Sequence, residues 1–185
     1  MITIPLDTQE AYLSQDATLG KSLVMPIAAG QHFVFEARVK FSHVLSGSDA
    51  LAKLVGLAGE GRAASGTMGA GELGSGVFIG FRAVGSAADE MDAVYATTTP
   101  IVHLDAAVVP QLKIQPNVYK KFGLYFNGRR LFYYVNGLQI GSGVLVNTTG
   151  FPVNKGLVPI FGGRSAGATS KTLTIDGWGI ARVDL

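Results

Sequence analysis

The sequence contains no cysteine and few charged residues. Asp, Glu, Lys and Arg make up 15% of its 185 residues, whereas about 25% is usual in globular proteins. The absence of cysteine excludes disulfides and thiolate metal ligands, and it is typical of proteins that fold without oxidation. The low charge predicts either a surface rich in Ser, Thr and Gly or a surface partly covered by other subunits.

Basic clusters and long apolar runs are also missing. Lys and Arg number 15 and Asp and Glu number 13, and the densest basic groups are the pairs Lys120-Lys121 and Arg129-Arg130. Since a nucleic-acid binder usually carries a clustered basic face, we expect no nucleic-acid partner. No run reaches the ~18 apolar residues of a membrane span, and the first residues lack the basic and apolar regions of a signal peptide. We therefore expect no membrane partner and no signal peptide.

Motifs for nucleotides, metals and catalysis are absent or out of context. Gly69–Gly74 matches G-x-G-x-x-G, but a strand rather than a helix is expected after it. His32, His43 and His103 lack metal-ligand spacing, and Asp89–Asp92 is better interpreted as a charged hairpin tip than as a calcium site. No Cys nucleophile or G-x-S-x-G elbow occurs. We expect no catalytic residue, no cofactor and no metal, hence a protein that is not an enzyme.

Glycine and short alternating segments are abundant. Glycine accounts for 25 residues, and Phe33–Phe41 alternates between apolar residues at odd positions and, from Glu36, charged residues at even positions, which predicts a strand with one buried face. Sustained helical periodicity is missing, so the sequence predicts an all-β sandwich or barrel. The expected strands are 19–25, 33–41, 51–57, 76–84, 93–99, 119–126, 129–135, 138–140, 156–161 and 171–185.

Turn residues indicate how some of these strands connect. Asn127-Gly128 and Asn136-Gly137 each separate two apolar-aromatic runs, which predicts two type I′ hairpins and a three-stranded meander. Pro159 predicts an edge strand or a bulge, and the change of alternation in the last strand predicts a bulge near Gly179 or Ala181.

The remaining segments predict an arm, one domain and two long loops. Residues 1–18 are less regular and are expected to form an N-terminal arm, followed by a single domain over 19–185. Two long connections, 58–75 and 101–115, are interpreted as surface loops, where binding function tends to lie. The alternation at the start of the arm suggests that it adds a strand to a neighbouring sheet. The expected assembly interface consists of Ile2, Ile4, Leu6, Tyr12 and Leu13.

Four segments in order resemble the concanavalin A-like lectin/glucanase group. Phe33–Val39 (FVFEARV) is similar to an early F-x-F-E-x-x-V strand, and Gly76–Phe81 to the central strand. Tyr119–Gly137 is similar to the late hairpin that ends in Asn/Asp-Gly, and Leu173–Val183 to the closing strand. The resemblance implies a jelly-roll β-sandwich of two antiparallel sheets. The glucanase triplet E-x-D-x-x-E or E-x-D-x-E and the calcium cluster of legume lectins are both missing, so no catalytic or metal residue is carried over.

The composition also resembles that of bacteriophage virion proteins. This resemblance implies a non-enzymatic virion structural protein, most simply a capsid decoration protein that forms homo-oligomers and contacts the major capsid protein or other virion subunits. The alternative is a lectin-like glycan-binding module for cell surfaces, whose expected contacts are Tyr95, His103, Tyr125 and Tyr134. A diverged glycosidase is the third hypothesis, and it requires two carboxylates across a cleft.

Overall fold

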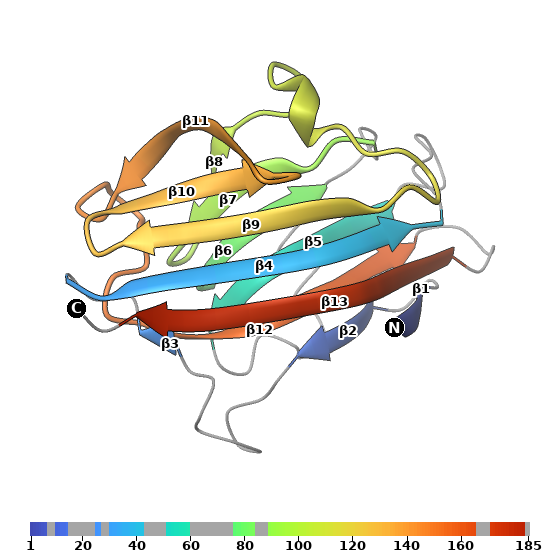
Figure 1. Ribbon diagram of the computed structural model, residues 1–185, viewed down its shortest axis with the longest axis horizontal. Coiled ribbons are helices and arrows are strands. Elements are labelled where there is room, and N and C mark those ends of the chain that lie inside the picture. Colours follow the sequence, from blue (N-terminus) through green and yellow to red (C-terminus); the bar gives the residue numbers. More distant parts are fainter. Residues whose placement is uncertain are drawn as a thin grey trace.

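The computed structural model confirms the predicted fold class, since it consists of two antiparallel β-sheets (Figure 1). It describes residues 1–6, 10–14, 25–26, 30–42, 51–59, 76–83, 89–165 and 171–183. His43, the Gly69–Gly74 motif and most of the strand expected at 19–25 lie outside these ranges. No helix in the described ranges has the length and apolar character needed to cross a membrane.

The first sheet has six strands in an order far from that of the sequence. In this sheet the first strand of the chain, β1, pairs with the last, β13. β4 lies between β13 and β9. The three consecutive strands β9, β10 and β11 complete this sheet, which confirms the predicted meander. From edge to edge, its strands are β1 (Ile2–Leu6), β13 (Lys171–Val183), β4 (His32–Phe41), β9 (Lys120–Asn127), β10 (Arg130–Val135) and β11 (Leu138–Leu145).

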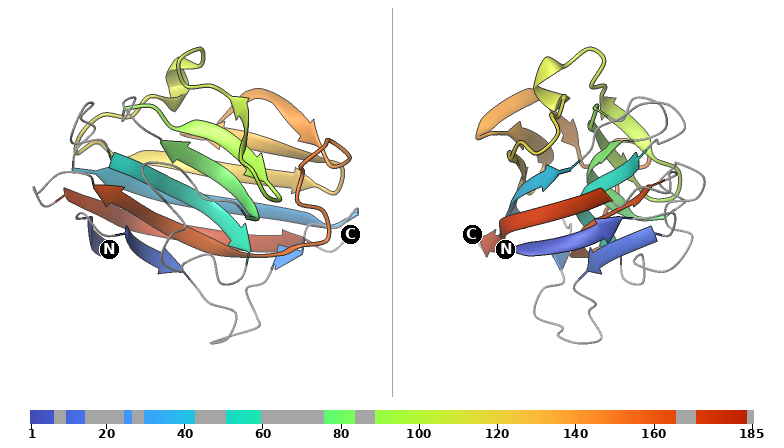
Figure 2. Two further views of the ribbon diagram at one scale, coloured as in Figure 1. Left: turned by 180° about the vertical axis from the view of Figure 1, so that it is seen from behind. Right: turned by 90° about the vertical axis from the view of Figure 1, so that its right-hand side faces the viewer.

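The second sheet has seven strands and lies face to face with the first (Figure 2). Its short strand β3 (Met25–Pro26) pairs only with β12, and a single 3-10 turn, Pro110–Leu112, follows β8. Its main path consists of β2 (Glu10–Ser14), β12 (Gly156–Ser165), β5 (Leu51–Gly59), β6 (Phe78–Ala83), β7 (Asp92–Ala96) and β8 (Ile101–Leu104).

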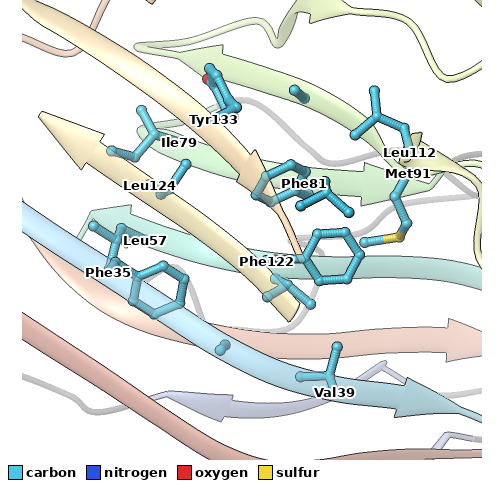
Figure 3. Close-up of a cluster of buried hydrophobic side chains, with 14 of the residues drawn as sticks. Phe35, Val39, Leu57, Ile79, Phe81, Met91, Leu112, Phe122, Leu124 and Tyr133 are labelled. Carbon is cyan, nitrogen blue, oxygen red and sulfur yellow. The ribbon is translucent and has the colours of Figure 1, made fainter. Parts of the chain in front are cut away.

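Apolar side chains fill the space between the sheets, as the alternation predicted. The odd positions of β4 from Phe33 to Phe41 are all buried, because successive strand residues point to opposite faces. Aromatic rings from both sheets meet in the middle: the Phe81 ring centroid lies 4.7 Å from that of Phe122 and 5.5 Å from that of Tyr133 (Figure 3). The Tyr133 hydroxyl donates a 2.8 Å hydrogen bond to the Val94 carbonyl, so the one polar atom of this ring is satisfied inside the core.

The two Asn-Gly turns differ from each other. Asn136 and Gly137 have φ of 52° and 81°, which confirms a type I′ turn. In the other hairpin Asn127 ends β9, and its Oδ1 accepts the N–H groups of Arg129 and Arg130 at 3.1 and 2.7 Å. The two loop residues are therefore Gly128 and Arg129, and only Gly128 has positive φ, 78°. This is the type II′ pattern, so the predicted type I′ turn is wrong at this position.

The structure places the segments of the expected arm in the sandwich itself. β1 pairs with β13 and β2 pairs with β12, so each sheet takes one edge strand from this region. The backbones of Ile4 and Leu6 lie in β1, and those of Tyr12 and Leu13 lie in β2; their side chains lie outside the description. Ile2 is 45% exposed. That these five residues contact another subunit stays a prediction.

Two local expectations need correction, and a third is met only at one residue of its strand. The expected loop 101–115 begins with an edge strand, β8. The bulge in β13 lies between Ile175 and Gly177, not near Gly179 or Ala181. Pro159 lies inside the sheet, paired with Leu57 of β5, at a point that neither β2 nor β3 pairs on the other side. A residue without an N–H is tolerated there, because no ladder bond is lost.

Candidate functional site

The outer face of the six-stranded sheet is hollowed across four neighbouring strands. Two adjoining hollows of about 660 and 300 Å³ are both lined by Val34 and Glu36 of β4. The larger extends over β13 and the smaller over β9 and β10. Figure 1 views the molecule from this side, with β13, β4, β9 and β10 in front. We refer to the two together as the sheet hollow.

Glycines form the floor of the sheet hollow. After the bulge in β13, Trp178 and Ile180 pack against the core, so the intervening Gly177 and Gly179 face outward. A Cβ atom at Gly177 or Gly179 would meet nothing within 4 Å. On β9, Gly123 is likewise part of the floor. The sheet is therefore bare of side chains where neighbouring positions carry large ones, and a ligand can approach the backbone.

Two ion pairs cross the sheet hollow. Arg38 Nη1 lies 2.5 Å from Asp176 Oδ2, and Lys121 Nζ lies 3.0 Å from Glu36 Oε1. The side chains of Arg38 and Lys121 are 52% and 42% exposed, and such exposed pairs contribute only about 0–1 kcal/mol to stability. Their main effect is to hold charged hydrogen-bond donors and acceptors at set places beside the glycine floor.

Half-exposed aromatic rings border the other side of the sheet hollow. Tyr125 and Tyr134 line it, and the Tyr125 ring stacks on Phe132 with centroids 6.1 Å apart and an interplanar angle of 20°. The Tyr134 hydroxyl donates to Gln139 Oε1 at 3.4 Å. Such rings offer an apolar surface together with a polar edge, which suits a ligand that carries both C–H faces and hydroxyls.

Of the four residues predicted to contact a glycan, the structure places two in the sheet hollow. Tyr125 and Tyr134 both line the sheet hollow, whereas Tyr95 is 5% exposed and packs in the core, 5.9 Å between ring centroids from Phe151. His103 lies on β8, and its Nε2 is 2.7 Å from the Ser142 carbonyl of β11. Tyr95 and His103 therefore lie on the other sheet, outside the sheet hollow.

Sequence reasoning missed most of the site. The outward positions of β4, Glu36 and Arg38, are visible in the alternation as a polar face. Nothing in the sequence identifies Lys121, Gly123 or Gly179 as their neighbours, because pairing between distant strands is not encoded in local alternation.

The acidic segment 89–92 has structural contacts. Glu90 pairs with Lys113 at 3.2 Å, and Asp92 Oδ1 accepts the Ala106 N–H at 2.9 Å. Burial raises the pKa of Asp92, and the hydrogen bond from Ala106 acts in the opposite direction. Within the described ranges no three His, Cys, Asp or Glu side chains gather as metal ligands.

Comparison with known proteins identifies the fold. No protein-family model and no curated protein sequence matches the chain. Solved structures do match. The catalytic domain of an endo-1,3-β-glucanase (laminarinase) from Thermotoga petrophila RKU-1 is 12% identical with a TM-score of 0.58, covering 98% of this chain and 77% of that one. A structure from work on endo-acting O-glycanases of the human gut microbiota is 10% identical with a TM-score of 0.62, covering 99% and 79%.

The alginate lyase A1-II′, of polysaccharide lyase family 7, is 12% identical with a TM-score of 0.55, covering 95% of this chain and 71% of the lyase. These likenesses confirm the concanavalin A-like jelly roll and show that the fold is shared with proteins that act on glycans. At such identities they establish the fold alone.

These structural similarities bear on two expectations, that the protein is not an enzyme and that it decorates a capsid. The prediction of a protein that is not an enzyme is wrong as an inference from missing motifs, because the fold is shared with a glucanase and lyases. The predicted virion role, capsid decoration, receives no support from these similarities, which lie on the side of the glycan alternative.

Proposed function

We propose that the protein binds a carbohydrate chain in the sheet hollow. The observation that carries this proposal is the bare glycine floor between exposed ion pairs and half-exposed tyrosines. Ligand sites combine a concave apolar surface with a few placed polar groups. The rings of Tyr125 and Tyr134 suit the apolar face of a pyranose, and Glu36, Asp176 and Arg38 suit its hydroxyls as acceptors and donor.

The dimensions of the floor suit an extended chain. Neighbouring strands are about 4.8 Å apart, so the four strands β13, β4, β9 and β10 span about 14 Å. The structures that share the fold include proteins named for their action on polysaccharides or mucin, which favours a carbohydrate over other extended ligands.

The test adds a side chain to the glycine floor of the sheet hollow at a position where the fold has room for it. Gly179→Leu adds a side chain where a Cβ meets nothing within 4 Å, so it should fold normally and occupy the sheet hollow. Ala107→Leu adds a similar side chain at an exposed loop position away from it and serves as the control. Binding is measured by calorimetry and by retention on immobilised polysaccharides. The panel contains four neutral chains (β-glucan, mannan, xylan and dextran) and two acidic ones (pectate and dextran sulfate).

We expect the wild type and Ala107→Leu to bind at least one member of the panel, and Gly179→Leu to lose at least tenfold in affinity. Binding of no polysaccharide by the wild type, or equal binding by Gly179→Leu, would overturn the proposal. Thermal melting of each variant shows whether its fold is kept.

Cleavage of the bound chain is the second candidate function. Glu36 and Asp176 both line the larger hollow, and glycoside hydrolysis commonly uses two carboxylates that flank the scissile bond. Release of reducing ends from each polysaccharide is followed for the wild type, Glu36→Gln and Asp176→Asn. If the wild type cleaves no member of the panel, or if both variants retain its rate, these two residues have no catalytic role.

A further inference from the structure

The outward side chains of the six-stranded sheet form rows that change in character along the strands. One row across β4, β9 and β10 contains Val34, Tyr125 and Phe132. Two residues along each strand, the next row contains Glu36, Gly123 and Tyr134. The third row contains Arg38 and Lys121 and meets Gly177 of β13. Since each step is about 6.8 Å, the aromatic row and the cationic row are about 14 Å apart.

The cationic row places like charges directly opposite each other. Arg38 of β4 and Lys121 of β9 are cross-strand partners on the same face, an arrangement that destabilises a sheet. Lys40 follows Arg38 on the same face of β4. Glu36 and Asp176 form ion pairs with Lys121 and Arg38, and within the described ranges Lys40 contacts the Tyr119 ring rather than a carboxylate. This end of the sheet hollow therefore keeps a surplus of positive charge.

Tyr119 holds two of these cations in place. The Arg38 guanidinium carbon lies 4.5 Å and the Lys40 ammonium 4.9 Å from the centroid of its ring. A guanidinium has five N–H donors, and Asp176 contacts Arg38 through Nη1. A half-exposed guanidinium fixed by an aromatic ring offers its other donors in a planar fork, the geometry that matches a carboxylate or sulfate.

Two further lysines beyond Tyr119 make contacts within the protein, and Lys113 is paired with Glu90. A further hollow of about 280 Å³ is lined by Tyr119, Lys113 and Lys120. The Lys120 ammonium donates to the Lys113 carbonyl, and burial lowers the pKa of Lys120. The net charge of the whole chain is only +2, so the gathering of Arg38, Lys40 and Lys121 is a local feature and not a reflection of a generally basic protein.

We propose, resting on the carbohydrate-binding function proposed above, that the ligand of the sheet hollow is an anionic glycan. Its pyranose faces lie against Tyr125 and Tyr134, and its carboxylate or sulfate groups are bound by Arg38 and Lys121, with Lys40 adding positive charge beside them. A neutral polysaccharide would cover Lys40 and the remaining Arg38 donors without giving them a charged partner, and desolvating charged groups that gain no partner weakens binding.

The experiment compares polysaccharides that share a backbone and differ in charge. Pectate is compared with fully methyl-esterified pectin, and dextran sulfate with dextran, by calorimetry at several salt concentrations. The first pair tests carboxylates and the second tests sulfates. Variants are Arg38→Gln, Arg38→Lys and Lys121→Gln, and the control is Lys155→Gln, which removes a charge at an exposed position outside the sheet hollow.

We expect at least tenfold tighter binding of one acidic chain than of its neutral counterpart. Arg38→Gln and Lys121→Gln should each weaken acidic binding at least fivefold and weaken neutral binding by a smaller factor, and Lys155→Gln should have no effect. Arg38→Lys should give an intermediate loss, because it keeps the charge and loses the fork. Thermal melting checks that the variants are folded.

The anionic-ligand proposal and the carbohydrate-binding proposal are overturned by different results. Equal affinity for charged and neutral chains overturns the anionic ligand and leaves the binding function intact, whereas absence of all carbohydrate binding overturns both. A loss with Lys155→Gln as large as with Arg38→Gln shows nonspecific attraction to a basic protein and also overturns the inference.

Discussion

A lysine buried between the two sheets makes stability depend on pH in a predictable direction. Lys53 of β5 is fully buried, and its ammonium lies 5.5 Å from the centroid of the Phe41 ring. The pKa of Lys53 is lowered to about 7, mainly by burial, while the charge of Asp89 raises it and the charge of Lys171 lowers it. The folded protein therefore releases this proton near neutral pH, where the unfolded chain still binds it.

The sign and size follow from proton linkage. The pKa of Lys53 is about 7 in the folded protein and 10.5 in the unfolded chain. Between these values the unfolded chain holds more protons, so the free energy of unfolding rises with pH by up to about 1.4 kcal/mol per unit. From pH 7 to 9.5 the expected rise from this one group is about 3 kcal/mol. Below about pH 6 both states are protonated and the contribution is flat.

Urea unfolding at half-unit steps from pH 6 to 9.5 measures this rise. The upper limit avoids tyrosine ionisation, because burial raises the pKa of Tyr133 and its unfolded form ionises near pH 10. Lys53→Met should remove the rise, and the half-exposed Lys113→Met should keep it. Parallel curves for the wild type and Lys53→Met would refute the reasoning.

Three further predictions concern the sandwich. Gly56→Ala should cost about 3 kcal/mol or more, because its Cβ would clash with the backbone oxygen of Ile79 in β6, whereas Gly177→Ala should be neutral. Equal urea midpoints for the two variants would contradict the close approach of β5 and β6. Tyr133→Phe should cost about 1 kcal/mol through the lost hydrogen bond to Val94, which lowers the melting temperature by about 3 °C, and an unchanged melting temperature would show that this bond contributes nothing. Gly137→Ala should cost about 1 kcal/mol because φ is +81°, measured by urea unfolding; no loss would show that the turn relaxes.

The strands and their buried faces were predictable because period-two alternation is a local property. Phe33–Phe41 was expected as a strand with odd positions buried, and it forms β4 with that face in the core. The same local logic was insufficient at Asn127-Gly128. There the strand pairing extends to Asn127, which moves the two-residue loop to Gly128-Arg129. Turn type depends on this register, which the dipeptide alone does not determine.

The sheet hollow was beyond local reasoning. Its floor needs Gly179, near the end of the chain, to lie beside Glu36, and Glu36 to lie beside Gly123. Tyr125 and Tyr134 were selected as aromatic side chains, and so was Tyr95, which the structure places in the core. Whether an aromatic ring faces a ligand or the core depends on the phase of its strand and on which sheet covers it. Neither can be inferred from the presence of an aromatic residue in the sequence.

By itself, the sequence determined the all-β class, most strand positions, the buried face of β4 and the absence of disulfides. These follow from residue type and from the spacing of apolar side chains along one strand. Only the tertiary structure decided that β13 lies between β1 and β4, and that β4 lies beside β9. Alternation specifies which face of a strand is buried but not its neighbour, so the juxtaposition of Arg38, Lys121 and the glycine floor arises only when distant strands pair.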